Sequence, residues 1–215
     1  MIQHHPDDLT LSAFSAGTLD LGLHVAIATH LASCPRCRGW ARSMEQVGGA
    51  VLTSLPPAAM ESDALARVEA RLDEPRNPVR IETAAPSPEV AIAGLPKFVQ
   101  RYPFGNWQWV APRVHLRPIE LPRPAHTRVF LLKAAPGTKM LAHSHTGTEM
   151  TCVLSGAFSH DGGRFGPGDF DLGDEAVEHR VTVEGEDDCI CLIAMHGELK
   201  LSGFLGRLMQ PFVRL

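Results

Sequence analysis

The 215-residue sequence predicts an α + β protein of two domains, a small N-terminal helical bundle followed by an all-β barrel of jelly-roll type. Up to about residue 73 the apolar residues recur at helical spacing. Beyond residue 96, short apolar runs alternate with turn sequences such as PGT, HDGG and FGPGD. Between these regions, the proline-rich stretch EPRNPVRIETAAPSPEVAIAGLP is typical of a linker. We therefore expect a helical domain over residues 1–75, a linker over 76–96 and a barrel over 97–215, each domain with its own core.

Composition and charge narrow the class of protein. A hydrophobic fraction of 44% and a charged fraction of 20% are those of a globular chain. The formal net charge of -4 lacks the basic excess that binds phosphates, so we expect a protein partner and no direct contact with nucleic acid. The first residues, MIQHHPDDLT, do not resemble an export signal, and no apolar run approaches the roughly 18 residues that span a bilayer. The sequence therefore predicts a cytoplasmic protein without a membrane anchor.

Three or four helices are predicted in the first domain, and we place them near residues 8–16, 19–33, 35–52 and 62–72. In the last of them Leu65, Val68 and Leu72 repeat at helical spacing and form an apolar stripe. Its other face carries more acidic than basic residues. This acidic face is equally consistent with a basic partner and with an ordinary solvated surface.

A histidine and two cysteines form the first candidate metal site. His30, Cys34 and Cys37 follow the pattern H-x-x-x-C-x-x-C, which on a helix brings the three side chains to one face. Pro35 suits the first turn of a helix, so we expect the helix to break at Cys34 and the Cys34 thiol to lie at a helix N-terminus. A redox C-x-x-C is expected beside a βαβ unit, which this segment lacks. Imidazole and thiolate ligands instead favour a tetrahedral Zn²⁺.

A closed zinc site needs a fourth ligand, and two histidines near the N-terminus could supply it. His5 is the better candidate because it precedes Pro6, which favours an extended arm that could cross the bundle, and His4 is the alternative. An H-x-x-x-C-x-x-C array in a small helical domain with an upstream histidine resembles the zinc-containing anti-sigma domain family. That resemblance implies binding of an extracytoplasmic-function sigma factor. It also implies that the zinc ligands are His5, His30, Cys34 and Cys37.

A second candidate metal site lies in the β domain, in the array G-x5-H-x-H-x3-E-x6-G over residues 137–156. His143 and His145 project to the same face of a strand, and Glu149 follows after a turn. A later strand must supply the fourth donor, and His179 is the strongest candidate. This ligand set could hold Zn²⁺, Fe²⁺, Mn²⁺ or Ni²⁺.

The array over residues 137–156 resembles the first motif of the cupin family in full. The second cupin motif is degenerate: Gly168 and His179 fit its layout, but its usual proline, glycine and asparagine are absent. The resemblance therefore implies a cupin barrel with a metal and puts an inherited catalytic activity in doubt.

The remaining cysteines lie in the predicted strands. Cys189 and Cys191 share one strand face by their spacing. They could form a reactive pair near the metal, although buried cysteines usually serve packing, and the sequence favours that second interpretation. No role is predicted for His115, His126, His160 or His196, which have no metal-ligand spacing.

A zinc anti-sigma domain followed by a cupin resembles the ChrR-like transcriptional regulators. The resemblance implies a non-enzymatic protein that sequesters a sigma factor one to one and releases it under stress such as singlet oxygen or organic hydroperoxides. It also implies zinc in the cupin site. One alternative is a metal-dependent cupin enzyme, a dioxygenase or isomerase with a helical extension for docking or oligomerisation, which would need an open coordination position and a substrate-shaped cavity. A third possibility is a cytosolic redox sensor that acts on a different protein partner.

Overall fold

The computed structural model describes residues 1–72, 74, 92–122, 126–173 and 180–201. Four α-helices precede the strands, as predicted. Asp7 caps the first helix by accepting from the backbone N–H of Thr10, and Asp20 caps the second in the same way. Cys34 and Pro35 begin the third helix, which confirms the predicted break. The helices are α1 (Asp8–Ser15), α2 (Leu21–Ser33), α3 (Pro35–Ser54) and α4 (Ala64–Leu72).

The β domain consists of antiparallel strands, as expected for a cupin fold. They form a six-stranded sheet in the order β1-β2-β3-β10-β5-β8, a three-stranded sheet β7-β6-β9 and the pair β11-β4. Within the described residues these sheets do not join into one closed barrel. A single turn of 3-10 helix, η1 (Val99–Arg101), precedes the first strand. The strands are β1 (Gln108–Ala111), β2 (Val114–Ile119), β3 (Arg128–Ala134), β4 (His143–His145), β5 (Glu149–Ser155), β6 (Ala157–His160), β7 (Gly163–Phe165), β8 (Phe170–Gly173), β9 (Thr182–Glu184), β10 (Cys189–Met195) and β11 (Leu199–Leu201).

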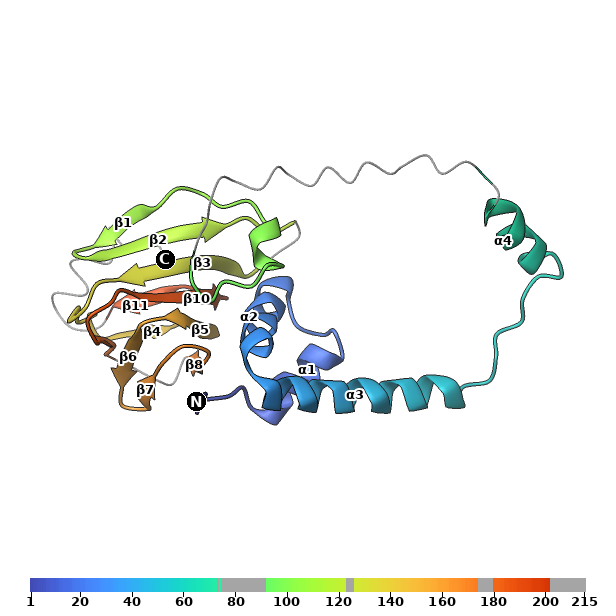
Figure 1. Ribbon diagram of the computed structural model, residues 1–215, viewed down its shortest axis with the longest axis horizontal. Helices are drawn as coiled ribbons and strands as arrows, with labels where there is room; N and C mark the ends of the chain where they lie inside the picture. Colours follow the sequence, from blue (N-terminus) through green and yellow to red (C-terminus); the bar gives the residue numbers. More distant parts are fainter. Residues whose placement is uncertain (73, 75–91, 123–125, 174–179, 202–215) are drawn as a thin grey trace.

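The six-stranded sheet is covered on both faces, which explains the continuous apolar runs in its central strands. On β10, Leu192 and Ala194 face the helices, whereas Cys191 and Ile193 face the three-stranded sheet, as the period of two requires. Helix α2 lies across the first face, against β5 and β10 (Figure 1). The molecule is therefore layered as helices, large sheet and small sheet.

The helices and the large sheet share one hydrophobic core. Val25 and Ile27 of α2 belong to the same buried cluster as Leu131 of β3 and Leu192 of β10. This differs from the separate cores that the sequence predicted, because the apolar face of α2 is completed by the sheet as well as by α1 and α3. Leu95, in the last part of the expected linker, is also buried in this cluster.

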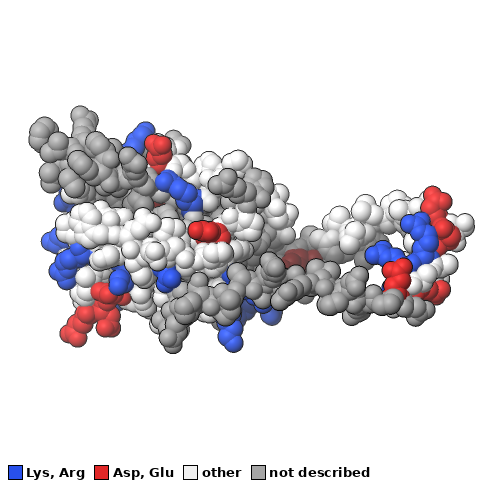
Figure 2. Space-filling view, turned by 90° about the horizontal axis from the view of Figure 1, so that it is seen from above, with Lys and Arg blue, Asp and Glu red and all other residues white. Residues whose placement is uncertain are grey.

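Helix α3 extends away from this shared core (Figure 1). Helix α4 lies apart from the other helices, at the end of the molecule farthest from the sheets. Figure 2 shows acidic and basic side chains together at this end of the molecule. Among the described helices, none combines the length and the apolar character needed to cross a membrane.

Candidate metal centre in the helical region and cavity in the barrel

The structure brings His5, His30, Cys34 and Cys37 together, as the sequence predicted. One ligand atom from each lies within 4.8 Å of the others. His5 Nδ1 is 3.5 Å from Cys34 Sγ and 3.4 Å from Cys37 Sγ. Two ligands of a tetrahedral zinc ion, with Zn–S of about 2.3 Å and Zn–N of about 2.0 Å, would stand about 3.5 Å apart. The side-chain arrangement therefore fits a four-coordinate Zn²⁺.

His30 is prepared for metal binding by its surroundings. Its Nδ1–H donates to the carbonyl oxygen of Gly168 at 2.8 Å, which leaves the lone pair on Nε2. That Nε2 is buried and has no hydrogen-bond partner among the described residues. Burial lowers the pKa of His30 to about 4, so the ring is neutral. A neutral imidazole with an otherwise unsatisfied, inward-facing nitrogen is the form that binds zinc.

The Cys37 thiol is costly to ionise without a cation. Burial and the neighbouring Cys34 raise the pKa of the Cys37 thiol to about 12. A bound divalent cation reverses this penalty because it stabilises the thiolate directly. The donor set, two sulfurs and two nitrogens, is one that zinc prefers.

His5 and His4 have different environments, which decides between the two histidines that the sequence left as candidates. The ring of His4 stacks on Phe165 with 4.1 Å between centroids, and its Nε2–H donates to the carbonyl of Arg164 at 3.1 Å. The His5 ring instead lies beside His30 and the thiols. His4 thus anchors the N-terminal arm on the β domain, and His5 joins the candidate metal group.

A cavity of about 420 Å³ lies within the β domain. Most of its lining is apolar, and a few polar side chains converge in it, as is usual for small-molecule sites. His143 and Glu149 both line this cavity, as do Thr151 and Asp171. The apolar part of the lining includes Val114, Phe130, Leu132, Phe158, Val183 and Ile193.

The predicted second metal site is only partly visible. The Nδ1–H of His143 donates to the carbonyl of Leu141 at 2.8 Å. Burial raises the pKa of Glu149, against the opposing influence of His143 and of a hydrogen bond from Thr151. His145 lies on β4, paired in register with Leu199 of β11. His179 lies outside the described residues, so this ligand set stays a prediction.

Comparison with known proteins decides the family. A family model described as the ChrR Cupin-like domain matches residues 99–199. The anti-sigma-E factor ChrR of Cereibacter sphaeroides is 35% identical over 218 residues, which cover 100% of this chain and 99% of that protein. The chain belongs to the ChrR family of anti-sigma factors. The relative is a regulatory protein, which places the chain with regulators and not with the cupin enzymes that the sequence left as an alternative.

A solved structure of the ChrR family has the same architecture. The crystal structure of Rhodobacter sphaeroides SigE in complex with the anti-sigma ChrR matches 91% of this chain and 99% of the matched chain, with a TM-score of 0.72 and 34% identity. The fold class predicted from sequence is therefore confirmed.

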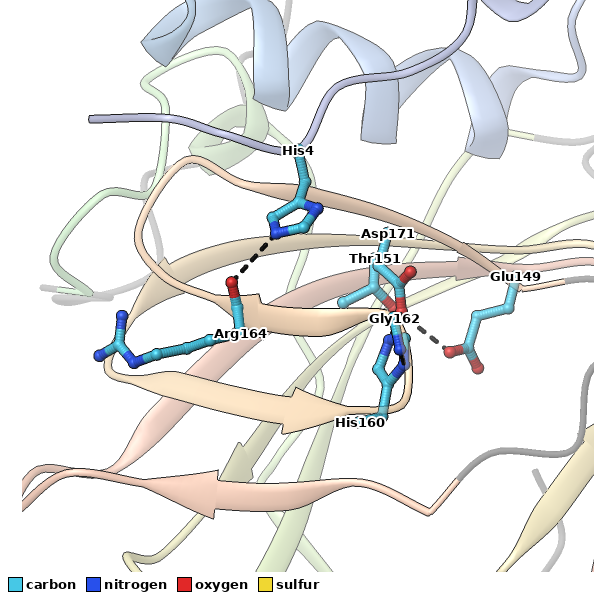
Figure 3. A network of polar contacts seen from close by, with 7 residues as sticks. All are labelled: His4, Glu149, Thr151, His160, Gly162, Arg164 and Asp171. Atoms are coloured by element: carbon cyan, nitrogen blue, oxygen red, sulfur yellow. Dashed lines mark hydrogen bonds and ion pairs between the residues drawn. The ribbon is translucent and has the colours of Figure 1, made fainter.

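Sequence reasoning missed a set of polar residues beside the cavity of this ChrR-family chain. His160, for which no role was predicted, lies 2.9 Å from a carboxylate oxygen of Asp171 on β8 (Figure 3). The Thr151 hydroxyl donates to Glu149 at 3.2 Å. Only the alternation of residues along β8 could have suggested that Asp171 faces inward, because no metal-ligand spacing marks these positions.

Cys189 and Cys191 share a strand face, as predicted, with their sulfurs 3.7 Å apart and buried. Both also line the cavity. The hydrogen bond to Cys189 and burial raise the pKa of Cys191 well above its ordinary value. A high pKa disfavours the reactive thiolate, which supports the packing interpretation for this state of the protein.

Proposed function

We propose that this chain binds and inhibits an extracytoplasmic-function sigma factor in the cytoplasm, as a one-to-one complex. In this proposal the helical region holds a structural zinc ion and supplies the contact surface. The barrel holds a second metal, zinc by resemblance, and is needed for release of the sigma factor under oxidative stress from singlet oxygen or organic hydroperoxides. The zinc ligands are His5, His30, Cys34 and Cys37, and the barrel ligands are His143, His145, Glu149 and His179.

The observation that carries the proposal is an exposed apolar surface on the part of the chain that extends from the core. Several large side chains there are more than half exposed, although apolar residues of this size are normally buried. On α4 no residue is buried, and the stripe predicted from sequence is more than half exposed. An amphipathic helix held away from its own core is suited to lie in an apolar groove of a partner. These residues are Val47, Val51, Leu52, Leu55, Met60, Leu65, Val68 and Leu72.

The family supports the identity of the partner. In the matched complex ChrR is bound to SigE, and the match extends over 91% of this chain. The polar face of α4 carries Glu69 as well as Arg67 and Arg71, so apolar contact with the stripe is the stronger support for partner binding.

Contacts between the cavity and the N-terminal arm support a role for the barrel in release. Asp171 lines the cavity and pairs with His160. The His160 ring stacks on Phe165 at 4.8 Å, and Phe165 stacks on His4 at 4.1 Å. Figure 3 shows His4 above the strands that carry this network. A change in the cavity that repositions His160 would thus reach the arm beside the candidate zinc site.

Co-purification tests the proposal directly. The full chain, expressed with each extracytoplasmic-function sigma factor of its own genome, should capture one of them at equal stoichiometry. The captured sigma factor should lose activity in a purified transcription assay when the chain is added. Failure to capture or inhibit any of these sigma factors would overturn the proposed function.

A further inference from the structure

The candidate zinc site is not built by the helices alone, because two of its ligands are held by the β domain. The carbonyl of Gly168, in the loop before β8, fixes His30 through Nδ1. The ring of Phe170, the first residue of β8, lies 5.7 Å from that of His30, edge to face. The second ligand held by the β domain is His5, which is positioned through the N-terminal arm.

Asp169 holds the N-terminal arm through backbone hydrogen bonds. One carboxylate oxygen accepts from the backbone N–H of Gln3 at 2.6 Å and from that of His4 at 3.0 Å. The other accepts from the N–H of Gly166 at 2.8 Å. Asp169 is 5% exposed, and the low local dielectric around a buried carboxylate strengthens its hydrogen bonds. A single buried carboxylate in the loop before β8 therefore holds the part of the arm that immediately precedes His5.

Further contacts fix the direction of the arm at the same point. The N–H of Phe170 donates to the carbonyl of His4 at 3.2 Å, and the His4 ring is held by Phe165 and Arg164. Gly168, at φ of +88°, leaves room for Ile2, since a Cβ there would stand 2.6 Å from the Ile2 Cδ1. With residues 2 to 4 held in this way, the position of His5 next to the thiols is set by the β domain.

We propose that Asp169 is a positioning residue for the metal site of the helical region, which acts by holding the N-terminal arm so that His5 reaches the metal. This inference rests on the proposed zinc site. Asp169 does not touch the metal, and its effect passes through His5. Outer partners of this kind commonly change metal affinity by about 10- to 100-fold when they are removed.

The test is a double-mutant cycle in the full-length, zinc-loaded chain. Asp169→Ala should release zinc to a chromogenic chelator about 10- to 100-fold faster than the wild-type chain does. His5→Ala should do the same. In the His5→Ala background, the further change Asp169→Ala should have little additional effect, since both substitutions remove the same ligand. Asp161→Asn, at an exposed turn between β6 and β7, is the matched control and should release zinc at the wild-type rate.

A spectroscopic readout separates positioning from general destabilisation. With Co²⁺ in place of Zn²⁺, Asp169→Ala should change the visible ligand-field absorption in the same direction as His5→Ala does, because both lose one nitrogen ligand. Asp169→Asn keeps one acceptor oxygen for the arm and should be intermediate in zinc release. It also keeps the test available if the alanine variant fails to fold.

Three results would overturn the inference: wild-type zinc release in both Asp169 variants, a wild-type cobalt spectrum in them, or equal and additive acceleration in the two backgrounds. A wild-type chain that binds no zinc at all would instead contradict the proposed metal site. Failure of a zinc-loaded wild-type chain to capture any sigma factor would count against the proposed function alone.

Discussion

The two ring nitrogens of His30 have different partners, and a metal on the second nitrogen would allow the residue to be completely buried. Nδ1 is satisfied by a backbone carbonyl of the β domain, whereas Nε2 faces the two thiols and His5. An apolar environment without a metal would leave that nitrogen uncompensated, which is costly. Zinc binding and burial of His30 therefore support each other.

Replacement of one thiol should remove the metal and the stability that comes with it. We expect Cys37→Ser to lose zinc, because a serine hydroxyl is a poor ligand for this ion, and to loosen the junction between α2 and α3. A strong chelator should lower the melting temperature of the wild-type chain by more than that of the variant. Cys152→Ala, which removes a buried thiol elsewhere, is the control and should keep its zinc. A zinc content in Cys37→Ser equal to that of the wild-type chain would contradict the assignment.

The barrel residues should affect release and not inhibition. We expect His143→Ala or Glu149→Ala to leave sigma-factor inhibition intact while slowing the loss of inhibition after exposure to singlet oxygen or an organic hydroperoxide. The reason is that both side chains line the cavity of the β domain, whereas the exposed apolar surface lies on α3, on α4 and on the segment between them. Release rates in purified transcription assays provide the measurement, with His196→Ala at an exposed position as control. Wild-type release in chains shown to lack the barrel metal would contradict the sensing role.

The residues of the helical metal group could be found from sequence because three of them follow the short pattern H-x-x-x-C-x-x-C, around the break between α2 and α3. Asp169 and Gly168 could not. Asp169 acts on backbone N–H groups 165 and 166 residues away, and Gly168 acts through its own carbonyl. Neither interaction leaves a pattern in side-chain type or spacing.

Helix α2 joins the helical region to the β domain. Its backbone at Gly22 closely approaches the side chain of Thr127. A Cβ at Gly22 would stand 2.7 Å from both Cβ and Cγ2 of Thr127, in the chain segment that leads into β3. The first turn of α2 therefore rests directly on the β domain. Sequence predicted the bounds of this helix within two residues but not its neighbour, because the apolar face of a helix does not specify what covers it.

A pair of glycine substitutions measures this contact. Gly22→Ala should lower the free energy of unfolding by about 1–3 kcal/mol, because the methyl group forces α2 away from Thr127. Gly39→Ala in α3, where a Cβ would meet nothing within 4 Å, should raise it by about 0.5–1 kcal/mol through better helix propensity. Chemical denaturation of both variants checks the difference. Equal stabilisation by the two substitutions would show that α2 does not press on the β domain.

Helix α4 should contribute to partner binding without contributing to the stability of the free chain. Leu65 is 68% exposed and Val68 is 54% exposed, so Leu65→Ser and Val68→Ser should change the free energy of unfolding by less than about 0.5 kcal/mol. Affinity for the sigma factor should fall about 10- to 100-fold, as for anchor residues of an interface. Ala66→Ser, also exposed on α4, is the matched control. Calorimetric titration measures this affinity. An unchanged affinity in both serine variants would contradict an interface on this helix.

On the scale of the whole molecule, the shared core changes what a separated helical domain can be. We propose that residues 1–75 still carry the contact surface for the sigma factor, since the exposed apolar residues of α3, of α4 and of the segment between them lie in this range. The same fragment would expose the face of α2 that packs on β5 and β10 and would lack the partners of its arm.

A fragment of residues 1–75 should therefore inhibit the sigma factor while being less stable and binding zinc more weakly than the full chain. Binding of the partner should restore part of this stability by mass action. Inhibition in transcription assays and competition for zinc with a chelator test the two halves of the prediction. A fragment that retains zinc as tightly as the full chain would show that the β domain contributes nothing to the metal site.

The contact of Asp169 with Gln3 and His4 also has a consequence for biosynthesis. The groups that meet are separated by 166 and 165 residues, so the arm leaves the ribosome long before its anchor does. At about 5–20 residues per second, translation places roughly 8 to 33 s between the two events. During this interval the nascent chain carries both thiols of the metal group without the loop that steadies its fourth ligand. Stable zinc loading should therefore be one of the last steps in the maturation of each newly made molecule.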